Sequence, residues 1–542
     1  MIEPVFKKPP PEGDHEPPPK RKRYWWRFTL ASMTIVSVVA AATAASILLY
    51  VGSIATALSH NNVLKNRVQR VLAQTHGGEP ENIVIIGSDK RANEPEDPGR
   101  SDTTLLLRLD PDRNAIALMS IPRDLKVEIP GYGTGKFNEA YSYGGPKLTL
   151  QVVKQLTGLQ INHVVNVDYL GFVRAVDAID CVYVDVDRRY YHSNVGLPPD
   201  EQYSEIDVQP GYQLLCGKKA LQYVRYRHTD TDLVRAARQQ DFLSDARQRV
   251  PIGDLVLGRN DLIDIFTEYT TSDISDQKTM LEVLKLFIAS RGASIKEIHF
   301  PATLGPSYVY ATESAIQEAV SKFLGIEASG GPRGSIEGRS QPSGKKSKKS
   351  TKKKRKEKPH VVKLKPPGED GLVPAAESGE LEAKTAARRV SGRFPIFYPT
   401  RLPSEAHYVE SDSYLHIQDP RVYHFKDTDG ERHAAYRMVA EYGPEYETQY
   451  FGVQGIRGWS DPPILDHPSE TRTIHGREYE IFLDGDRVKM IAWHRGDNTY
   501  WISNSLLQSL TNDQMVGMAR SARVIIPKGK PRGKQKQGSA QR

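Results

Sequence analysis

The 542-residue sequence is poor in cysteine and lacks several familiar catalytic motifs. Its two cysteines, Cys181 and Cys216, are too few for a disulfide framework. We find no Gly-x-Ser-x-Gly nucleophile elbow, no Walker loop and no His/Cys pattern with zinc spacing. These absences turn attention away from serine hydrolases, P-loop enzymes and zinc enzymes.

One long apolar segment is present. Residues 29–54 contain no charged side chain, and at about 1.5 Å per residue a helix of this length crosses the roughly 30 Å hydrocarbon core. We therefore predict a single transmembrane helix with residues 1–28 in the cytoplasm and everything after residue 55 outside. An A-x-A pattern at residues 55–57 leaves a cleaved signal peptide as the alternative, which the long apolar run disfavours. The orientation rests on the basic and aromatic residues that precede the span: Lys20, Arg21, Lys22, Arg23, Tyr24, Trp25, Trp26 and Arg27.

Outside the cytoplasm a bridge between the two cysteines would persist, and separate buried thiols are the other interpretation. The hydrophobic fraction is 38%, and the net charge of +8 lies in blocks rather than on one face. The basic block Lys345–Lys358 resembles a nucleic-acid patch, but no nucleic acid is expected on the exported side. It is either a contact for anionic wall polymers or lipid headgroups, or simply a solvated linker.

Strand-like and helix-like patterns alternate from residue 81 to residue 325. This alternation predicts an α/β (α+β) domain with a central mixed sheet flanked by helices. A stalk (55–80) precedes this domain, and a basic disordered linker (326–392) follows it. The expected strands are 82–87, 103–109, 115–121, 163–167 and 182–186, and the expected helices are 148–156 and 169–179.

A second small α+β domain is expected at 393–526, followed by a basic tail at 527–542. Its predicted strands lie at 479–483, 489–493 and 499–503, and its last helix, 512–522, begins at Thr511 or Asn512. The domain contains Trp459, Trp493, His494 and Trp501. These side chains either form a platform for sugars or fill a small core, and the core is the more frequent use of such residues.

Two aspartates stand near the ends of neighbouring predicted strands. Asp89 follows the first strand, and Asp102 opens the next one after a polar loop. Such a connection places both carboxylates at the same sheet edge, where ligand-facing groups are common. Each alone is equally explained as a turn or cap residue. Arg123 follows Pro122 where the third strand ends, and a surface turn is its simpler explanation.

The segment from 222 to 241 contains four arginines. If residues 222–228 form a strand, Arg225 and Arg227 point to one face. In the helix that follows, capped by Asp230 or Asp232, three more polar side chains share a face. The alternative is a solvated, salt-bridged surface helix. The residues on the shared helical face are Arg235, Arg238 and Gln239.

Arginine holds phosphate oxygens bidentately, and paired aspartates hold a hard divalent cation that screens the same phosphates. Beside a membrane anchor, this combination indicates a lipid-linked diphosphate. A hydroxyl that attacks a phosphorus needs this neutralisation, and no covalent protein nucleophile is required. Asp102 or Asp232 are the candidates for a general base.

In this order behind one N-terminal span, the motifs resemble those of the LytR-CpsA-Psr family of cell-wall ligases, over about residues 80–325. The sequence departs from the family pattern at Val234, where many members have Gly, and at Asp180-Cys181, where Gly-Gly is usual. The resemblance implies Mg²⁺ bound by Asp89 and Asp102, and catalytic roles for Arg123, Arg225, Arg227 and Asp102. It implies that the diphosphate is held by Arg123, Arg225, Arg227, Arg235, Arg238 and Gln239.

The resemblance also implies the reaction. The expected activity is the Mg²⁺-dependent transfer of a glycopolymer from a polyprenyl diphosphate carrier to a peptidoglycan hydroxyl, at the membrane and outside the cytoplasm. Two alternatives use the same residues: a polyprenyl-diphosphate hydrolase, in which water is the acceptor, and a non-catalytic wall-binding scaffold that grips diphosphate lipid.

Overall fold

A computed structural model shows the fold, and all of its described residues belong to one compact unit, Ile54–Arg542. For brevity, the described residues between 63 and 327 are called the first region, and those between 370 and 527 the second region. The structure describes residues 63–74, 78–89, 99–198, 202–226, 230–249, 270–274, short pieces between 278 and 286, 294–327, 333, 370–390, 392–411, 419–443 and 448–527.

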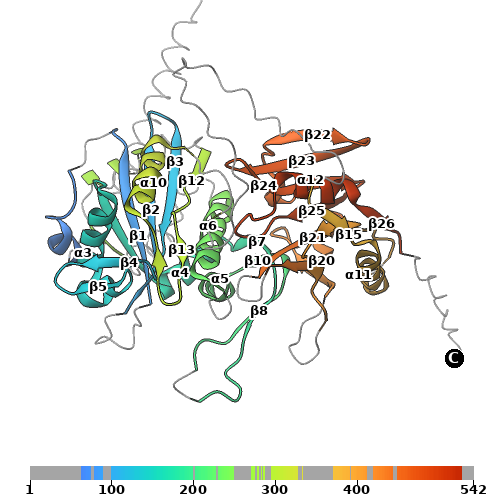
Figure 1. The fold of residues 1–542 in the computed structure, drawn as a ribbon, viewed down its shortest axis with the longest axis horizontal. Helices are drawn as coiled ribbons and strands as arrows, with labels where there is room; N and C mark the ends of the chain where they lie inside the picture. The colour runs from blue at the N-terminus through green and yellow to red at the C-terminus, as the bar shows by residue number, and fades with distance from the viewer. Residues whose placement is uncertain are drawn as a thin grey trace, which may run out of the picture. The chain divides into compact units, whose positions relative to one another are not determined.

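The first region is built on a six-stranded sheet in the order β11-β6-β1-β2-β3-β12 (Figure 1). The pairs β1–β2 and β2–β3 are antiparallel, whereas β1–β6 and β3–β12 are parallel. The sheet is therefore mixed, as the alternating sequence pattern predicts. Its strands are β1 (Glu81–Ser88), β2 (Ser101–Asp110), β3 (Ala115–Ile121), β6 (His163–Asp168), β11 (Thr270–Ser272) and β12 (Ser294–Glu297).

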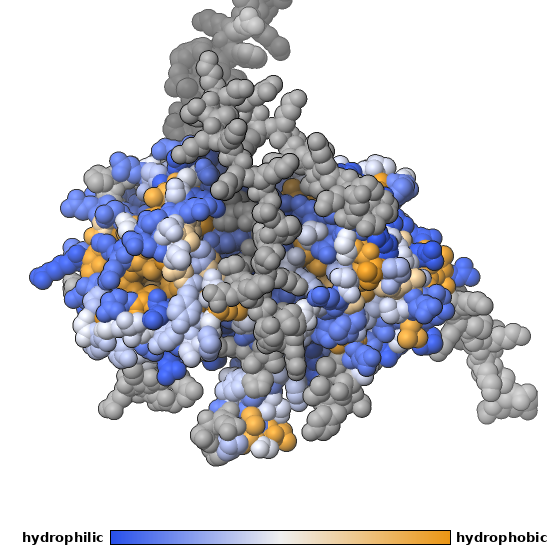
Figure 2. All heavy atoms as spheres, in the orientation of Figure 1, coloured by the Kyte–Doolittle hydropathy of each residue, from blue (hydrophilic) through white to orange (hydrophobic). Residues whose placement is uncertain are grey.

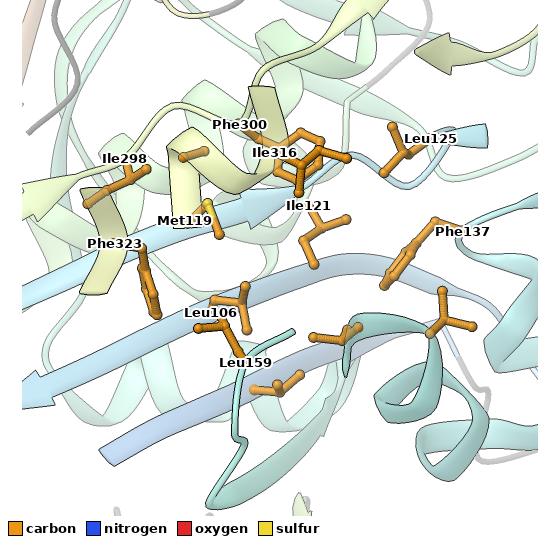
Figure 3. Packing of buried hydrophobic residues seen from close by; sticks show 14 of the residues in the cluster. Leu106, Met119, Ile121, Leu125, Phe137, Leu159, Ile298, Phe300, Ile316 and Phe323 are labelled. Atoms are coloured by element: carbon orange, nitrogen blue, oxygen red, sulfur yellow. The ribbon is translucent and has the colours of Figure 1, made fainter. Parts of the chain in front are cut away.

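Helices cover this sheet and build its core. Every residue of β3 is buried, which matches its continuous apolar sequence. Met119 of β3 faces Ile316 and Phe323 of α10 (Glu313–Gly325), and all three belong to one cluster (Figure 3). The core also takes in side chains from α2 (Val63–Val68), which lies in the predicted stalk, and from α3 (Glu139–Thr157).

A second layer of elements carries the arginine-rich segment. Here β7 (Val182–Val186) pairs with β10 (Gly211–Leu215), and three helices pack nearby. Cys181 and Cys216 form a disulfide, so the bridged alternative is the one the structure shows. The bridge joins the start of β7 to the first turn of α5. The helices are α4 (Tyr169–Ala178), α5 (Gly217–Arg225) and α6 (Asp232–Arg249).

The second region has an antiparallel sheet and its own apolar cluster. Thr511 caps α12 in a capping box with Gln514, as one of the two predicted starts requires. Whether this region is a separate domain stays a prediction, because it lies in the same compact unit as the first region. Its sheet contains β18 (His407–Tyr408), β19 (Arg421–Lys426), β20 (Arg432–Tyr442), β21 (Gln449–Arg457), β22 (Glu470–Ile474), β23 (Arg477–Asp484), β24 (Arg487–Arg495) and β25 (Asn498–Ser503).

Shorter elements complete both regions. On the face drawn in Figure 2, hydrophilic residues surround separate apolar patches. The remaining elements are β4 (Lys126–Ile129), β5 (Gly133–Lys136), β8 (Tyr190–His192), β9 (Ile206–Val208), β13 (Thr303–Leu304), β14 (Val309–Tyr310), β15 (Leu372–Pro374), α11 (Ala376–Arg389), β16 (Ile396–Tyr398), β17 (Arg401–Pro403), η2 (Pro463–Leu465), α12 (Asn512–Ser521) and β26 (Arg523–Ile525).

Three sequence predictions need comment. The linker expected to be disordered at 326–392 contains β15 and α11, because Leu372, Ala383 and Ala386 pack into the apolar cluster of the second region. The strand expected at 222–228 is wrong, because α5 occupies this segment up to Arg225. The predicted transmembrane helix at 29–54 lies outside the described residues. Among the helices that the structure describes, none has the length and apolar character needed to span a bilayer.

Candidate diphosphate site

The candidate site begins where β1 ends and β2 begins. Ser88 pairs with Ser101 across the two strands, so Asp89 and Asp102 lie at the same edge of the sheet, as predicted. The Asp89 N–H donates to the carbonyl of Arg100 at 3.1 Å, and the Arg100 N–H donates to Asp89 Oδ1. Backbone contacts thus hold the Asp89 carboxylate in place.

Asp102 is the centre of the cluster. Its Oδ1 accepts a hydrogen bond from Arg123 Nη1 at 2.5 Å, and its Oδ2 accepts one from the Tyr169 hydroxyl. Burial raises the pKa of Asp102, but nearby Arg235, the Tyr169 hydrogen bond and Arg123 outweigh burial and hold the pKa below its ordinary value. The Asp102 side chain is therefore an anion at neutral pH.

Arg123 links the sheet to the start of α6. Its backbone N–H donates to Asp232 Oδ2 at 3.0 Å, and its Nε lies 3.8 Å from Asp232 Oδ1. Its Nε also lies 3.8 Å from Asp124, which in turn accepts from Lys136 Nζ at 3.2 Å. The Arg123 side chain keeps 12% of its surface exposed, so a ligand can reach it.

The first turn of α6 adds a second guanidinium. The Thr231 hydroxyl accepts from the Val234 N–H at 3.3 Å, so Thr231 provides the cap that was predicted for Asp230 or Asp232. The Asp232 carboxylate instead binds Arg235, whose side chain is almost fully buried. Asp232 thereby holds Arg123 and Arg235 on the same side of the sheet edge.

Arg225 joins the cluster through an aromatic ring. Its guanidinium carbon lies 3.8 Å from the centre of the Tyr169 ring, whose hydroxyl donates to Asp102. Burial and then the charge of Asp102 raise the pKa of Tyr169, whereas Arg225 opposes this rise. Arg225 therefore reaches the site from the end of a helix rather than from the strand that was expected.

Tyr169 is a residue of the candidate site that the sequence pattern did not single out. Asp168 ends β6 and caps α4 by accepting from the Gly171 N–H at 2.7 Å. Because Asp168 pairs with Ser88 in the parallel β1–β6 ladder, Tyr169 emerges beside Asp89. A tyrosine directly after a strand at this edge is the signal that points to it.

Arg238 and Gln239 take a different place from the one predicted. Arg238 is 0% exposed, donates to Asp230 and to the Tyr226 carbonyl, and lies 4.5 Å from the Tyr190 ring centre. Gln239 Nε2 donates to the Val224 carbonyl at 3.1 Å. In this structure both side chains fasten α6 to α5 instead of facing a ligand.

The structure thus gathers Asp102, Arg123, Arg225 and Arg235 at one sheet edge, with Asp89 beside them. Arg227 lies outside the described residues. Arg188 is a further residue that the sequence analysis did not single out: it shares Asp230 with Arg238 and so holds the segment that leads into α6.

The carboxylates at this edge fit a hard divalent cation. Asp89 and Asp102 each contribute to raising the pKa of Tyr169, after burial, which places both charges around the same ring. Mg²⁺ is commonly bound by one or two carboxylates together with substrate phosphates. The lone pairs that Asp102 does not share with Arg123 and Tyr169 leave room for such coordination.

Among the described residues, two groups of three possible metal ligands lie close together, and neither includes Asp89 or Asp102. Asp177 lies near Cys181 and Cys216, but the two sulfurs are joined to each other. Glu297, His299 and Asp484 also lie close together. There the Arg333 guanidinium already binds Glu297 and Asp484.

Comparison with known proteins places the first region among cell-wall proteins. The sequence profile of the LytR_cpsA_psr family matches residues 47–323. The chain is 29% identical over 254 residues to the polyisoprenyl-teichoic acid–peptidoglycan teichoic acid transferase TagU of Oceanobacillus iheyensis, covering 45% of this chain and 75% of TagU. It is 31% identical over 179 residues to TagT of Bacillus subtilis, which carries the same transferase name, covering 33% of this chain and 55% of TagT.

A third relative and a solved structure extend the comparison. The probable cell wall biosynthesis protein LcpB of Corynebacterium glutamicum is 34% identical over 179 residues, covering 30% of this chain and 40% of LcpB. A TagT structure with bound octaprenyl pyrophosphate lipid aligns over 48% of this chain and 94% of its own, at 22% identity and a TM-score of 0.34.

Proposed function

The chain belongs to the LytR-CpsA-Psr family, and from this premise we propose that it transfers a glycopolymer from a polyprenyl diphosphate carrier to a hydroxyl of peptidoglycan. The names of the relatives support this reaction, because TagU and TagT are polyisoprenyl-teichoic acid–peptidoglycan teichoic acid transferases. The identity of the polymer is not part of the proposal.

One observation carries the proposal: Arg123, Arg225 and Arg235 converge on the sheet edge that bears Asp102. Guanidinium groups pair with phosphate oxygens through two parallel hydrogen bonds and keep their charge when partly buried. Arg123 and Arg225 are the two that keep exposed surface. We therefore expect these two to bind the diphosphate, and the buried Arg235 adds positive charge near Asp102.

The reaction replaces a phosphoanhydride bond of the diphosphate by a phosphoester bond to the acceptor. The acceptor hydroxyl oxygen forms a bond to the phosphorus that bears the glycopolymer, and the bond from that phosphorus to the bridging oxygen breaks. Polyprenyl monophosphate leaves with the bridging oxygen, and the hydroxyl proton passes to a base or to water. The arginines stabilise the charge that develops on the leaving phosphate, which is where such sites gain most of their rate.

The candidate bases differ in access. Asp232 is buried, and both of its oxygens serve Arg123 and Arg235. Asp102 is an anion with part of its side chain exposed. Asp102 is thus the more accessible of the two, but the contacts that lower its pKa make it a weak base.

We further propose that Asp89 and Asp102 would hold Mg²⁺. The bound ion would neutralise phosphate oxygens and help to orient the diphosphate. We also propose that residues 29–54 anchor the chain in the membrane with the site outside the cytoplasm, which the apolar sequence and the preceding basic residues support.

Reconstitution tests the proposal. The purified full chain is incubated with polyprenyl-diphosphate-linked glycopolymer, peptidoglycan and Mg²⁺, and polymer linked to peptidoglycan is measured. We expect linkage by the wild type and by Arg113→Ala, and its loss in Arg123→Ala and Asp102→Asn. Arg113 is a matched control, because it also pairs with an aspartate but at the opposite end of β2.

The other outcomes identify the alternatives. Release of free polymer without linkage would show a hydrolase instead. Unchanged linkage in both Arg123→Ala and Asp102→Asn would show that the cluster is not the catalytic site.

A further inference from the structure

The second region contacts the middle of α6, the helix that contributes Arg235 to the candidate site, and reaches its start indirectly. At the middle of α6, Asp241 accepts from Lys489 Nζ of β24 at 2.9 Å. It also accepts from both terminal nitrogens of Arg333, at 3.2 and 3.0 Å. Asp241 is therefore tied to the second region directly and through Arg333.

Arg333 is the hub of this contact. Its side chain is almost fully buried, and its Nη2 also binds Glu297 of β12 at 2.5 Å and Asp484 of β23 at 3.1 Å. Its backbone N–H donates to the Leu507 carbonyl at 2.9 Å. One guanidinium thus joins the central sheet of the first region, α6 and the second region. We call Asp241, Glu297, Arg333, Asp484 and Lys489 the clamp.

Before the first turn of α6 the contact is indirect and runs through an aromatic ring. The Arg188 guanidinium carbon lies 4.8 Å from the ring centre of Tyr450 in β21. Arg188 also binds Asp230, which binds Arg238 of α6. Tyr450 of the second region therefore covers the group that fixes the segment leading into the helix.

Between the Asp241 contact and the Arg188 contact, apolar side chains of both regions are buried. Leu506 and Leu507, which follow β25, belong to the same buried cluster as Val234 and Ala237 of α6. Asp185 of β7 binds Arg437 and accepts from Trp501 Nε1 at 2.9 Å, and these two residues of the second region are themselves 0% exposed. Among the predicted sugar-platform residues, Trp493 and Trp501 are fully buried, as the alternative of a packed core expects.

We propose that the second region is a brace that positions α6, and with it the arginine cluster of the candidate site. Arg188, Asp241, Arg333, Tyr450 and Lys489 are positioning residues in this proposal. The effect on diphosphate binding rests on the proposed function, whereas the effect on the rigidity of α6 does not.

The physical reason lies in how little of α6 is held by the sheet edge itself. At its first turn, Asp232 ties the helix to Arg123, and a shift there moves Arg235 and Asp232 together. Displacements of about 1 Å at a reacting centre are costly. Charged contacts at the middle of the helix and before its first turn, with an apolar surface between them, leave the helix one packed arrangement.

Hydrogen exchange of the full chain in detergent micelles, without any ligand, tests the brace directly. In Lys489→Met, we expect amides of α6 to exchange at least about threefold faster than in the wild type, while those of β20 and β21 stay unchanged. Lys384→Met is the matched control, since Lys384 also pairs with a carboxylate, Glu380, but within exposed α11. Unchanged exchange in α6, or equally faster exchange throughout the second region, would overturn the proposal.

A binding measurement then links the brace to the site. Tyr450→Leu removes the ring over Arg188, and Tyr450→Phe keeps it. With octaprenyl diphosphate as the probe, we expect the Kd of Tyr450→Leu to rise about 3- to 30-fold and that of Tyr450→Phe to match the wild type. Equal losses in both variants, or none in either, would contradict a positioning role for the ring.

The two measurements separate the two proposals. If the wild-type chain does not bind octaprenyl diphosphate, the proposed function fails, while the exchange of α6 still decides whether the second region is a brace.

Discussion

The start and the middle of α6 use the same kinds of charged group in different proportions. At the candidate site several guanidiniums lie around the aspartates: Asp102 binds Arg123, Asp232 binds Arg235 and lies 3.8 Å from Arg123, and Arg225 stacks on the Tyr169 ring. At the clamp three carboxylates, Asp241, Glu297 and Asp484, bind one guanidinium, that of Arg333. The first arrangement is richer in cations, and the second is richer in carboxylates.

The pKa directions express this difference. Arg235, Tyr169 and Arg123 overcome burial and keep the pKa of Asp102 low. At the clamp, burial raises the pKa of Glu297 to about 8 despite Arg333, with Asp484 adding to the rise. Burial also raises the pKa of nearby Asp245 to about 7. At Asp241 and Asp484, by contrast, Arg333 outweighs burial and keeps the pKa low, so Glu297 is the carboxylate bound to Arg333 that takes up a proton.

The largest effect is expected at the site. Arg123→Ala removes the guanidinium that binds Asp102 and has exposed surface for a phosphate. We expect kcat/KM for polymer transfer to fall about 100- to 1,000-fold, as when one preorganised donor is lost. Arg123→Lys should recover only part of the activity, because an ammonium cannot pair bidentately. Full activity of Arg123→Ala would show that the arginines of the candidate site, like the clamp, serve only the structure.

The next effect is on stability at the clamp. Arg333→Met removes the cation that Asp241, Glu297 and Asp484 share, so we expect the free energy of unfolding to fall by about 3 kcal/mol. Urea unfolding of the full chain measures this change. Arg113→Met is the control, since its partly exposed pair with Asp110 should cost far less. A neutral Arg333→Met would show that the clamp carboxylates need no shared cation.

The residues of the candidate site were easier to predict from the sequence than those of the clamp. β3 and β7 have the predicted bounds, because short apolar runs bounded by turns define strands well. Asp89 and Asp102 were placed at one edge because a strand, a loop and a strand leave few alternatives. Arg123 was likewise identified from its place just after the third predicted strand, which is β3.

Other parts depend on contacts that local sequence does not encode. Residues 222–225 alternate like a strand, but the disulfide and a hydrogen bond from the Gly217 N–H to Asp177 start a helix there. The face that Arg238 takes on α6 depends on the tyrosines around it. Arg333 lies in a linker-like segment, and its carboxylate partners are separated from it by 36 to 151 positions.

A smaller effect should appear as pH dependence. The pKa of Glu297 is about 8 in the folded chain and 4.5 ordinarily. Between these values the folded chain holds a proton that the unfolded chain has released, so stability falls as pH rises. We expect a slope of up to about 1.4 kcal/mol per pH unit from such a group, measured by urea unfolding between pH 5 and 8.

Glu297→Gln should flatten this slope without removing it. Burial lowers the pKa of His163, but hydrogen bonds to Asp273 and Glu81 outweigh burial and raise it to about 9. That stability is also lost as pH rises, from about 6.5 upward, so His163 adds to the slope in both proteins. A slope that is identical in wild type and Glu297→Gln would mean that Glu297 is already ionised and that the clamp is balanced like the site.

The smallest effect is expected for an ion pair with neither burial nor shared partners. Glu318 and Lys322 pair at 2.8 Å across one turn of α10, with the Glu318 side chain 69% exposed. Water screens this pair, so Glu318→Gln should change the free energy of unfolding by no more than about 0.5 kcal/mol, and by less at high salt. If it costs as much as Arg333→Met, burial is not what separates the clamp from ordinary surface charge. If it costs little, as we expect, burial is what separates the clamp pairs from ordinary surface charge.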